Sequence, residues 1–222
     1  QLVFQDPYSS LNPRKTVMEI LGRPLAVHGI AKSWMERRQR VLELLNLVGL
    51  GTEHIDRYPH EFSGGQRQRI AIARALSVDP ELIICDEPVS ALDVSIQAQV
   101  LNLFRELQER FSLTYLFIAH DLSVIRHISD RVAVMYAGRF VETGTTEEIL
   151  SSPAHPYTAK LIDCVPVLGQ PERRLDAIEG RPPVVNRLPV GCAFAPRCPR
   201  AQDDCRAAPI PLTQLGDGRT VR

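Results

Sequence analysis

Two adjacent carboxylates after a short apolar run give the strongest chemical signal in the chain. Residues 82–85 form a continuous apolar segment of the kind found in a strand buried on both faces, and Asp86 and Glu87 follow it directly. Ligands of open α/β sheets gather at the carboxyl ends of strands. There, one carboxylate can bind Mg²⁺ while a second orients or deprotonates an attacking water. We therefore predict magnesium binding by Asp86 and action on water by Glu87; a solvated acidic turn explains this pair equally well by itself.

A serine and two glycines ahead of a run of strong helix formers predict a phosphate-binding turn. Ser63 is a favourable N-cap for a helix that continues to about residue 76. Gly64 and Gly65 let backbone donors approach a ligand closely, and Gln66 follows them. A helix N-terminus offers N–H groups and a partial positive charge to a phosphate. A capped helix without any ligand is the alternative.

Strands alternate with helices around these residues. Residues 115–119 form a second apolar run, so two strands of a parallel sheet are predicted. Between the two strands, apolar side chains recur at steps of three and four, which predicts a crossover helix: Ile96, Val100, Leu103, Phe104, Leu107 and Phe111. Residues 132–142, with Ala137 and Gly138 in the middle, predict a hairpin.

A helical region is predicted over residues 16–50. It contains an apolar stripe formed by Val41, Leu44, Leu45 and Val48, and glycines near residue 50 mark its end. Beyond residue 151 the composition changes, because 11 of the 17 prolines lie between residues 153 and 211. Proline breaks helices, so this part is predicted to be a loop-rich extension.

Charge and hydropathy narrow the classes of function. The 222 residues include 26 basic and 26 acidic side chains, so the net charge is zero and gives no indication of a nucleic-acid partner. The apolar runs are far shorter than the roughly 20 residues of a membrane span. Any work at a membrane would therefore require a partner.

Five features, taken together, resemble the ATP-binding-cassette (ABC) ATPases. In chain order they are Gln5, the turn Ser63-Gly64-Gly65-Gln66, the pair Asp86-Glu87, Asp93 in residues 90–93, and His120 after the second strand. Their order and separations are those of that superfamily. The resemblance implies an α/β fold with a P-loop-type parallel sheet, a helical subdomain, and ATP and Mg²⁺ as ligands.

The resemblance also implies a role for each matching residue. Asp86 would ligate Mg²⁺ and Glu87 would be the general base. Gln5 would contact magnesium or water and sense the γ-phosphate, which His120 would also touch. Asp93 would lie in the loop that crosses the dimer interface. The turn 63–66, in which Phe62 precedes Ser63 where leucine is commoner, would close on the ATP held by a second ATPase chain.

One part of the family pattern has no counterpart in the sequence. ABC ATPases hold the phosphates in a glycine-rich loop that ends in Gly-Lys-Ser/Thr, upstream of the position of Gln5, and no such loop is present. We therefore expect a chain that lacks the N-terminal phosphate-loop part of the ATPase and is inactive alone.

Two further segments narrow the resemblance to one branch. Residues 4–14 and 154–158, the latter with the sequence Ala-His-Pro-Tyr-Thr, look like the ATPase subunits of oligopeptide and dipeptide importers, a branch that includes nickel and glutathione importers. The implied domains are a partial ATPase domain over residues 1–150, with a helical subdomain at about 14–76 and a catalytic core at about 77–150, and a C-terminal extension over residues 151–222.

The implied function is to energise peptide import from the cytoplasmic face of the bacterial inner membrane. The implied partners are a second ATPase subunit, identical or different, two membrane permease subunits and, indirectly, an extracytoplasmic solute-binding protein, with no nucleic acid. One alternative is a non-hydrolysing half that offers only its turn 63–66 to a partner's ATP site. Another is a soluble ABC ATPase of DNA repair or translation, against which the extension and the neutral charge argue.

Three closely spaced cysteines lie in the extension, at Cys192, Cys198 and Cys205. Such a group indicates thiolate ligation of zinc or iron–sulfur, and a fourth ligand would complete the site. A [4Fe–4S] cluster is one expectation, with Cys164 as the substitute fourth ligand within the chain. Reduced thiols in a folded tail are the alternative, and Cys85 is expected to be a core residue.

Overall fold

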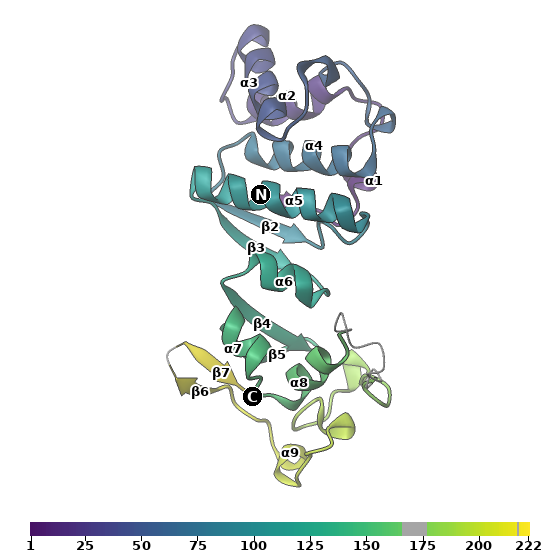
Figure 1. Ribbon diagram of the computed structural model, residues 1–222, viewed down its shortest axis with the longest axis vertical. Helices are drawn as coiled ribbons and strands as arrows, with labels where there is room; N and C mark the ends of the chain where they lie inside the picture. The colour runs from purple at the N-terminus through teal and green to yellow at the C-terminus, as the bar shows by residue number, and fades with distance from the viewer. Residues whose placement is uncertain (166–176, 217) are drawn as a thin grey trace. The chain divides into compact units, whose positions relative to one another are not determined.

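The computed structural model describes residues 1–165, 177–216 and 218–222, and the chain divides into two compact units, residues 1–124 and 125–222. Figure 1 shows the helices and strands of both units. Helix α6, Leu122–Ile128, contains the division. The domain boundary that the sequence suggests at residue 150 stays a prediction.

The first unit is built on a parallel sheet of three strands in the order β1-β2-β3. The strands are β1, Leu2–Val3, β2, Leu82–Asp86, and β3, Thr114–Ile118. Leu2 pairs with Ile84, and Ile84 pairs with Leu116. The carboxyl ends of the three strands therefore lie at the same edge of the sheet. The two predicted strands are confirmed, as is their parallel pairing.

Helix α5, Val94–Phe111, is the predicted crossover between β2 and β3 and packs on one face of the sheet. The ring of Phe104 is edge-on to Tyr115 and Phe117, with centroids 5.4 and 5.6 Å apart. On the opposite face, Leu116 and Ile118 are 54% and 46% exposed. The prediction that this apolar run is buried on both faces is therefore wrong for β3, because no described element of the unit covers its second face.

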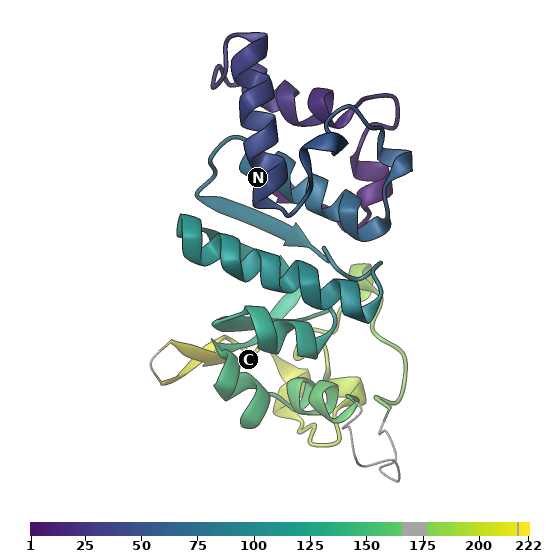
Figure 2. The ribbon, with the colours of Figure 1, turned by 45° about the horizontal axis from the view of Figure 1, so that its top comes forward.

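In the helical part of the first unit, α1, α2 and α3 pack against α4 (Figures 1 and 2). The elements of this part are α1, Pro7–Ser10, α2, Val17–Val27, α3, Trp34–Leu47, the 3₁₀ turns η1, Thr52–His54, and η2, Pro59–Glu61, and α4, Gly64–Leu76. The stripe predicted between residues 41 and 48 is buried at all four positions. Gly49, with φ of +70°, follows the C-cap of α3 in a left-handed conformation that favours glycine.

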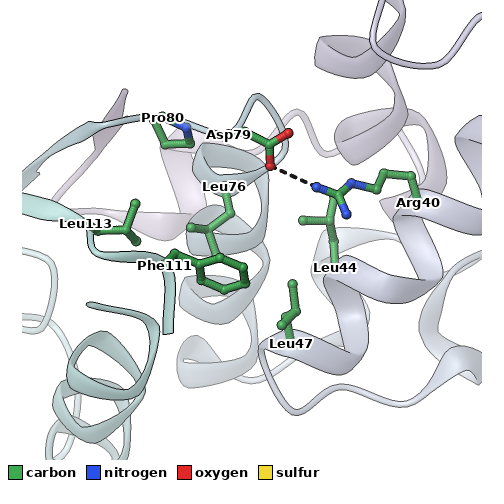
Figure 3. A pocket seen from close by; sticks show the side chains of 8 residues that line it. All are labelled: Arg40, Leu44, Leu47, Leu76, Asp79, Pro80, Phe111 and Leu113. Atoms are coloured by element: carbon green, nitrogen blue, oxygen red, sulfur yellow. Dashed lines mark hydrogen bonds and ion pairs between the residues drawn. The ribbon is translucent and has the colours of Figure 1, made fainter. Parts of the chain in front are cut away.

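A hollow of about 130 Å³ lies where α3, the end of α4 and the beginnings of β2 and β3 meet (Figure 3). Leucine side chains and Phe111 form its walls, and an ion pair between Arg40 Nη2 and Asp79 Oδ1, 2.8 Å apart, stands at its side. The hollow is at the amino ends of the strands, opposite the edge at which Asp86 lies.

The second unit contains an antiparallel sheet in the order β4-β5-β7-β6. Its strands are β4, Arg131–Tyr136, β5, Arg139–Thr145, β6, Thr213–Gly216, and β7, Arg219–Val221. The predicted hairpin is β4 and β5. Ala137 and Gly138 have φ of 48° and 78°, as a two-residue type I′ turn requires.

Short helices and turns complete the second unit. They are α7, Thr146–Ser151, α8, Pro156–Asp163, η3, Val185–Arg187, η4, Ala195–Arg197, and α9, Asp204–Ala207. Phe194 is fully buried, and its ring lies 5.3 and 5.4 Å from those of Tyr136 and Tyr157. Residues of the loop-rich segment, among them Cys198 and Ile210, thus pack against a small aromatic core. Within the part of the chain that the structure describes, no helix is long and apolar enough to cross a bilayer.

Candidate active site

Three side chains predicted to act on the nucleotide meet just beyond the carboxyl ends of the three parallel strands. Gln5 follows β1, Glu87 follows β2 and His120 follows β3. Gln5 Nε2 donates a hydrogen bond of 3.0 Å to Glu87 Oε2, and His120 Nδ1 lies 3.0 Å from the same oxygen. The His120 side chain is 70% exposed and that of Glu87 only 25%. One carboxylate oxygen is thus held by two neighbouring strand ends while the site stays open to a ligand.

The backbone of Glu87 is fixed in a strained conformation. Its φ of +44° is uncommon for any residue other than glycine, and such strain persists only where neighbouring structure enforces it. Here the Glu87 N–H donates to Ile118 O at 3.0 Å, and the Glu87 carbonyl accepts from Ser90 N and Ser90 Oγ at 3.2 and 3.0 Å. These bonds hold the backbone of Glu87 at the end of β2, and the contacts with Gln5 and His120 hold its carboxylate.

Asp86 is the last residue of β2 and pairs with Ile118 in the sheet. Its side chain is exposed, beside Glu87 in sequence but outside the Gln5–Glu87–His120 hydrogen-bond group. An exposed carboxylate at a strand end is a suitable oxygen ligand for Mg²⁺. The residues present therefore fit the cation that the sequence predicts.

The turn 63–66 begins α4 as predicted. Ser63 Oγ accepts from Gln66 N at 3.3 Å and Gln66 Oε1 accepts from Ser63 N at 3.0 Å, so the two side chains cap the helix reciprocally. A Cβ added to Gly65 would lie 2.4 Å from Ile96 Cγ2, and one on Gly64 would lie 3.4 Å from Leu92 Cδ2. The turn therefore lies against the start of α5, where the exposed Asp93 is the N-cap.

The structure thus separates the predicted residues into two groups. Gln5, Glu87 and His120 are joined directly and Asp86 adjoins them, whereas the turn 63–66 and Asp93 form a second group. Among the described residues no hydrogen bond joins the two groups. This separation is what a turn serving a second nucleotide would show, and the role of each residue stays a prediction.

We expect Gly65→Ala to destabilise the first unit and Gly64→Ala to be tolerated. The new methyl at position 65 would overlap Ile96, and such overpacking costs about 1–3 kcal/mol, whereas at position 64 the methyl makes an ordinary contact. Thermal unfolding of the two purified variants compares them. Equal melting temperatures would show that the start of α5 moves aside freely.

The three cysteines of the extension do not form the predicted metal group. Among residues 1–165, 177–216 and 218–222, no three His, Cys, Asp or Glu side chains are arranged to hold a metal ion. Cys192, Cys198 and Cys205 instead pack against the aromatic core of the second unit. Cys192 Sγ lies 3.9 Å from His155 Nε2. The [4Fe–4S] expectation, including Cys164 as a ligand, therefore finds no support here, and the folded-tail alternative describes these thiols better.

Cys85 in β2 and His155 at the start of α8 are both buried. Cys85 is fully buried, and burial raises the pKa of its thiol to about 12, which fits the core role predicted for it. His155, in the segment that links this chain to peptide importers, is also buried. Its Nδ1 accepts a hydrogen bond of 3.0 Å from Tyr157 N and so caps α8. This part of the sequence pattern has a structural role that spacing alone did not reveal.

Sequence reasoning missed one contact near the site. The guanidinium of Arg67, in the first turn of α4, stacks on the ring of Tyr8 in α1, 3.8 Å from its centroid. The two residues are 59 positions apart. Tyr8 lies in the importer-like segment 4–14 and Arg67 follows the turn 63–66, but neither segment contains a signal that the two side chains meet.

Two protein families and several curated relatives match this chain. Residues 1–90 match the ABC transporter family, and residues 141–205 match the family described as oligopeptide/dipeptide transporter, C-terminal region. The dipeptide transport ATP-binding protein DppF of Haemophilus influenzae is 53% identical over the whole chain, which spans 68% of that relative. The oligopeptide transport ATP-binding protein AppF of Bacillus subtilis is 56% identical over 93% of the chain, which spans 63% of it.

A solved structure places the fold in the same class. A dimeric ATP-binding cassette in a post-hydrolysis state, bound to ADP and phosphate, is 32% identical with a TM-score of 0.57, covering 66% of this chain and 63% of that one. The fold and the strand-end site therefore define an ABC ATPase with parallel and antiparallel sheets. The chain belongs to the ATP-binding subunit family of oligopeptide and dipeptide ABC transporters, and it spans about two thirds of the length of the curated relatives it matches.

Proposed function

We propose that the protein to which this chain belongs hydrolyses ATP to energise the import of peptides through a membrane permease. The observation that carries the proposal is the convergence of Gln5 and His120 on one oxygen of Glu87 at the carboxyl ends of adjacent strands. The names of the peptide-transport relatives supply the class of transported solute.

In this proposal Glu87 is the general base. Its carboxylate accepts a proton from water as the water oxygen bonds to the γ-phosphorus and the bond to the ADP oxygen breaks. The side-chain amide of Gln5, which donates from Nε2, and the imidazole of His120 hold the carboxylate at the strand ends. Asp86 would hold Mg²⁺, which neutralises phosphate charge when it is bound.

The turn 63–66 would act on a second nucleotide. The backbone N–H groups of Gly64 and Gly65 lie at the start of a 13-residue helix, where a phosphate is well accommodated. Because the turn is not joined to Glu87, we propose that it closes on ATP held by a second ATPase subunit. Asp93, next to it, would lie at the same interface.

The phosphate loop of the first nucleotide would be supplied by residues outside this chain. Two observations support this: the relatives are about half as long again, and one apolar face of the parallel sheet is half exposed at Leu116 and Ile118. The complete subunit would work peripherally on the cytoplasmic face of the membrane with its permease subunits.

The test is reconstitution of the complete subunit with its permease and solute-binding protein in lipid vesicles. We expect uptake of labelled di- and oligopeptides that requires ATP and Mg²⁺, together with release of phosphate. Parallel assays with nickel and glutathione separate the other solutes of the branch. If peptide is transported while this subunit hydrolyses no ATP, the result would instead support the alternative of a non-hydrolysing ATPase subunit that contributes only its turn 63–66 to a partner's ATP site.

A further inference from the structure

Two arginines of α4 fasten it to α1, the short helix that follows Gln5. Arg67 stacks on the Tyr8 ring, and Arg74 Nη1 donates a hydrogen bond of 2.5 Å to Ser10 O. The two arginines are seven residues apart, so they lie on one face of the helix two turns from each other. These two contacts are both with α1, which is therefore held at two points.

Arg67 also holds the segment that leads into the turn 63–66. Its Nε donates to Pro59 O at 2.6 Å and its Nη2 to His60 O at 3.4 Å. One side chain, 7% exposed, thus joins α1, η2 and the first turn of α4. Gln66, the last residue of the turn, directly precedes it.

The burial of the Arg67 guanidinium is not explained by a gain in folding stability alone. Arg67 Nη1 is buried, and the described residues offer it no hydrogen-bond partner. A buried donor without a partner is destabilising. The Tyr8 ring is the counterpart that remains for this part of the cation, and cation–π attraction is strongest where the cation is desolvated.

The chain of contacts continues to the strand-end site. Asp6 Oδ1 accepts a hydrogen bond of 2.8 Å from Tyr8 N and caps α1, and Gln5, the residue before it, donates to Glu87. Gln5 is therefore linked to α1, and through the stacked Tyr8 and Arg67 to the start of α4, by an unbroken series of contacts.

We infer that Arg67 and Tyr8 are positioning residues that couple the Gln5–Glu87–His120 group to the turn 63–66 of the same chain. The inference rests on the proposed function, in which the first group serves the chain's own ATP and the turn serves a partner's. Occupation of one nucleotide site thereby sets the position of the turn at the other. Neither Tyr8 nor Arg67 contacts a nucleotide in this proposal, so their loss is expected to lower kcat more than it raises the KM for ATP.

Tyr8→Leu in the complete subunit is the sharpest test, because the ring is 64% exposed and its replacement leaves the core intact. For the purified ATPase without permease, we expect kcat to fall roughly 5- to 10-fold, a loss in the range for a cation–π contact to a buried guanidinium, while the KM for ATP changes less than about twofold. Tyr8→Phe keeps the ring face and is expected to retain the wild-type kcat. Amide exchange at residues 63–67 should quicken in Tyr8→Leu and not in Tyr8→Phe.

Arg67→Lys gives an independent second variant, and Arg69→Lys is its matched control. Arg69 lies in the same helix, but its Nη1 donates to Val48 O near α3 and does not contact α1. We expect a lower kcat only for Arg67→Lys, and no further loss when Tyr8→Leu is added to it.

Three results would overturn the inference: an unchanged kcat in Tyr8→Leu, additive losses in the double variant, or a loss that appears only with the permease present. The last would assign the ring to a permease contact. Failure of the wild-type subunit to hydrolyse ATP would instead refute the proposed function. That result is seen without any variant, so it is distinct from failure of the inference about Tyr8 and Arg67.

Discussion

Glu87→Gln in the complete subunit is expected to bind ATP with near wild-type affinity and to lose turnover by about 10²- to 10⁴-fold, the usual contribution of a general base. The amide is the same size as the carboxylate, and its oxygen can still accept from Gln5 Nε2. Asp86 keeps its carboxylate for Mg²⁺. The attacking water loses only its proton acceptor, so chemistry fails while binding persists.

Phosphate release at saturating ATP, together with equilibrium ATP binding, measures the two effects separately. Glu109→Gln is the matched control, because Glu109 is exposed on α5, outside the group formed by Gln5, Glu87 and His120. Near-normal steady-state hydrolysis by Glu87→Gln would overturn the role of general base. Loss of ATP binding together with turnover would show instead that the side chain is needed to build the site.

Glu142→Gln is expected to cost the second unit about 3–5 kcal/mol, the range for removing one partner of a buried ion pair. The Glu142 side chain is fully buried in β5. Its Oε1 accepts from Ala154 N at 2.8 Å and from Arg219 Nη2 at 2.9 Å, and its Oε2 accepts from His155 N at 3.0 Å. One carboxylate thus ties β5 to the start of α8 and to β7.

Chemical denaturation, with hydrogen exchange in residues 131–163 as the readout of unfolding, measures this loss. Glu147→Gln is the matched control, since Glu147 is exposed in the first turn of α7. Equal unfolding free energies for the two variants would show that the buried pair contributes nothing beyond the surface substitution.

Low pH is expected to weaken the contacts of the Glu142 carboxylate. Burial raises the pKa of the Glu142 carboxyl, but the hydrogen bonds from Ala154 N, Arg219 and His155 N prevail and hold the pKa below its ordinary value of 4.5. Because the folded-state pKa is depressed, this stabilisation is fully present above pH 4.5 and is lost as the pH falls through the folded-state pKa. The wild-type unit should therefore lose stability below that pH, and the acid limb should be shallower in Glu142→Gln.

Much of the local structure follows from the sequence, because it depends on near neighbours. The Ser63 cap of α4, the apolar stripe of α3 and the hairpin turn at Ala137 and Gly138 all depend on residues within a few positions of one another. The apolar run of β2 and the periodicity of α5 predicted a crossover unit for the same reason. The family resemblance added Gln5 and His120 to the candidate site, where spacing alone gave them no partner.

Contacts between distant segments were decided by the tertiary structure. Gln5 and Glu87 are 82 residues apart and meet because β1 and β2 lie side by side in a parallel sheet. Nothing in the sequence predicts the left-handed backbone of Glu87, which bonds to Ile118 and Ser90 enforce. The cysteine spacing suggested a cluster, yet the thiols pack around the aromatic core that contains Phe194. Sequence patterns record which residues could do chemistry, whereas packing decides which of them meet, because hydrogen bonds and ring contacts act only over a few ångströms.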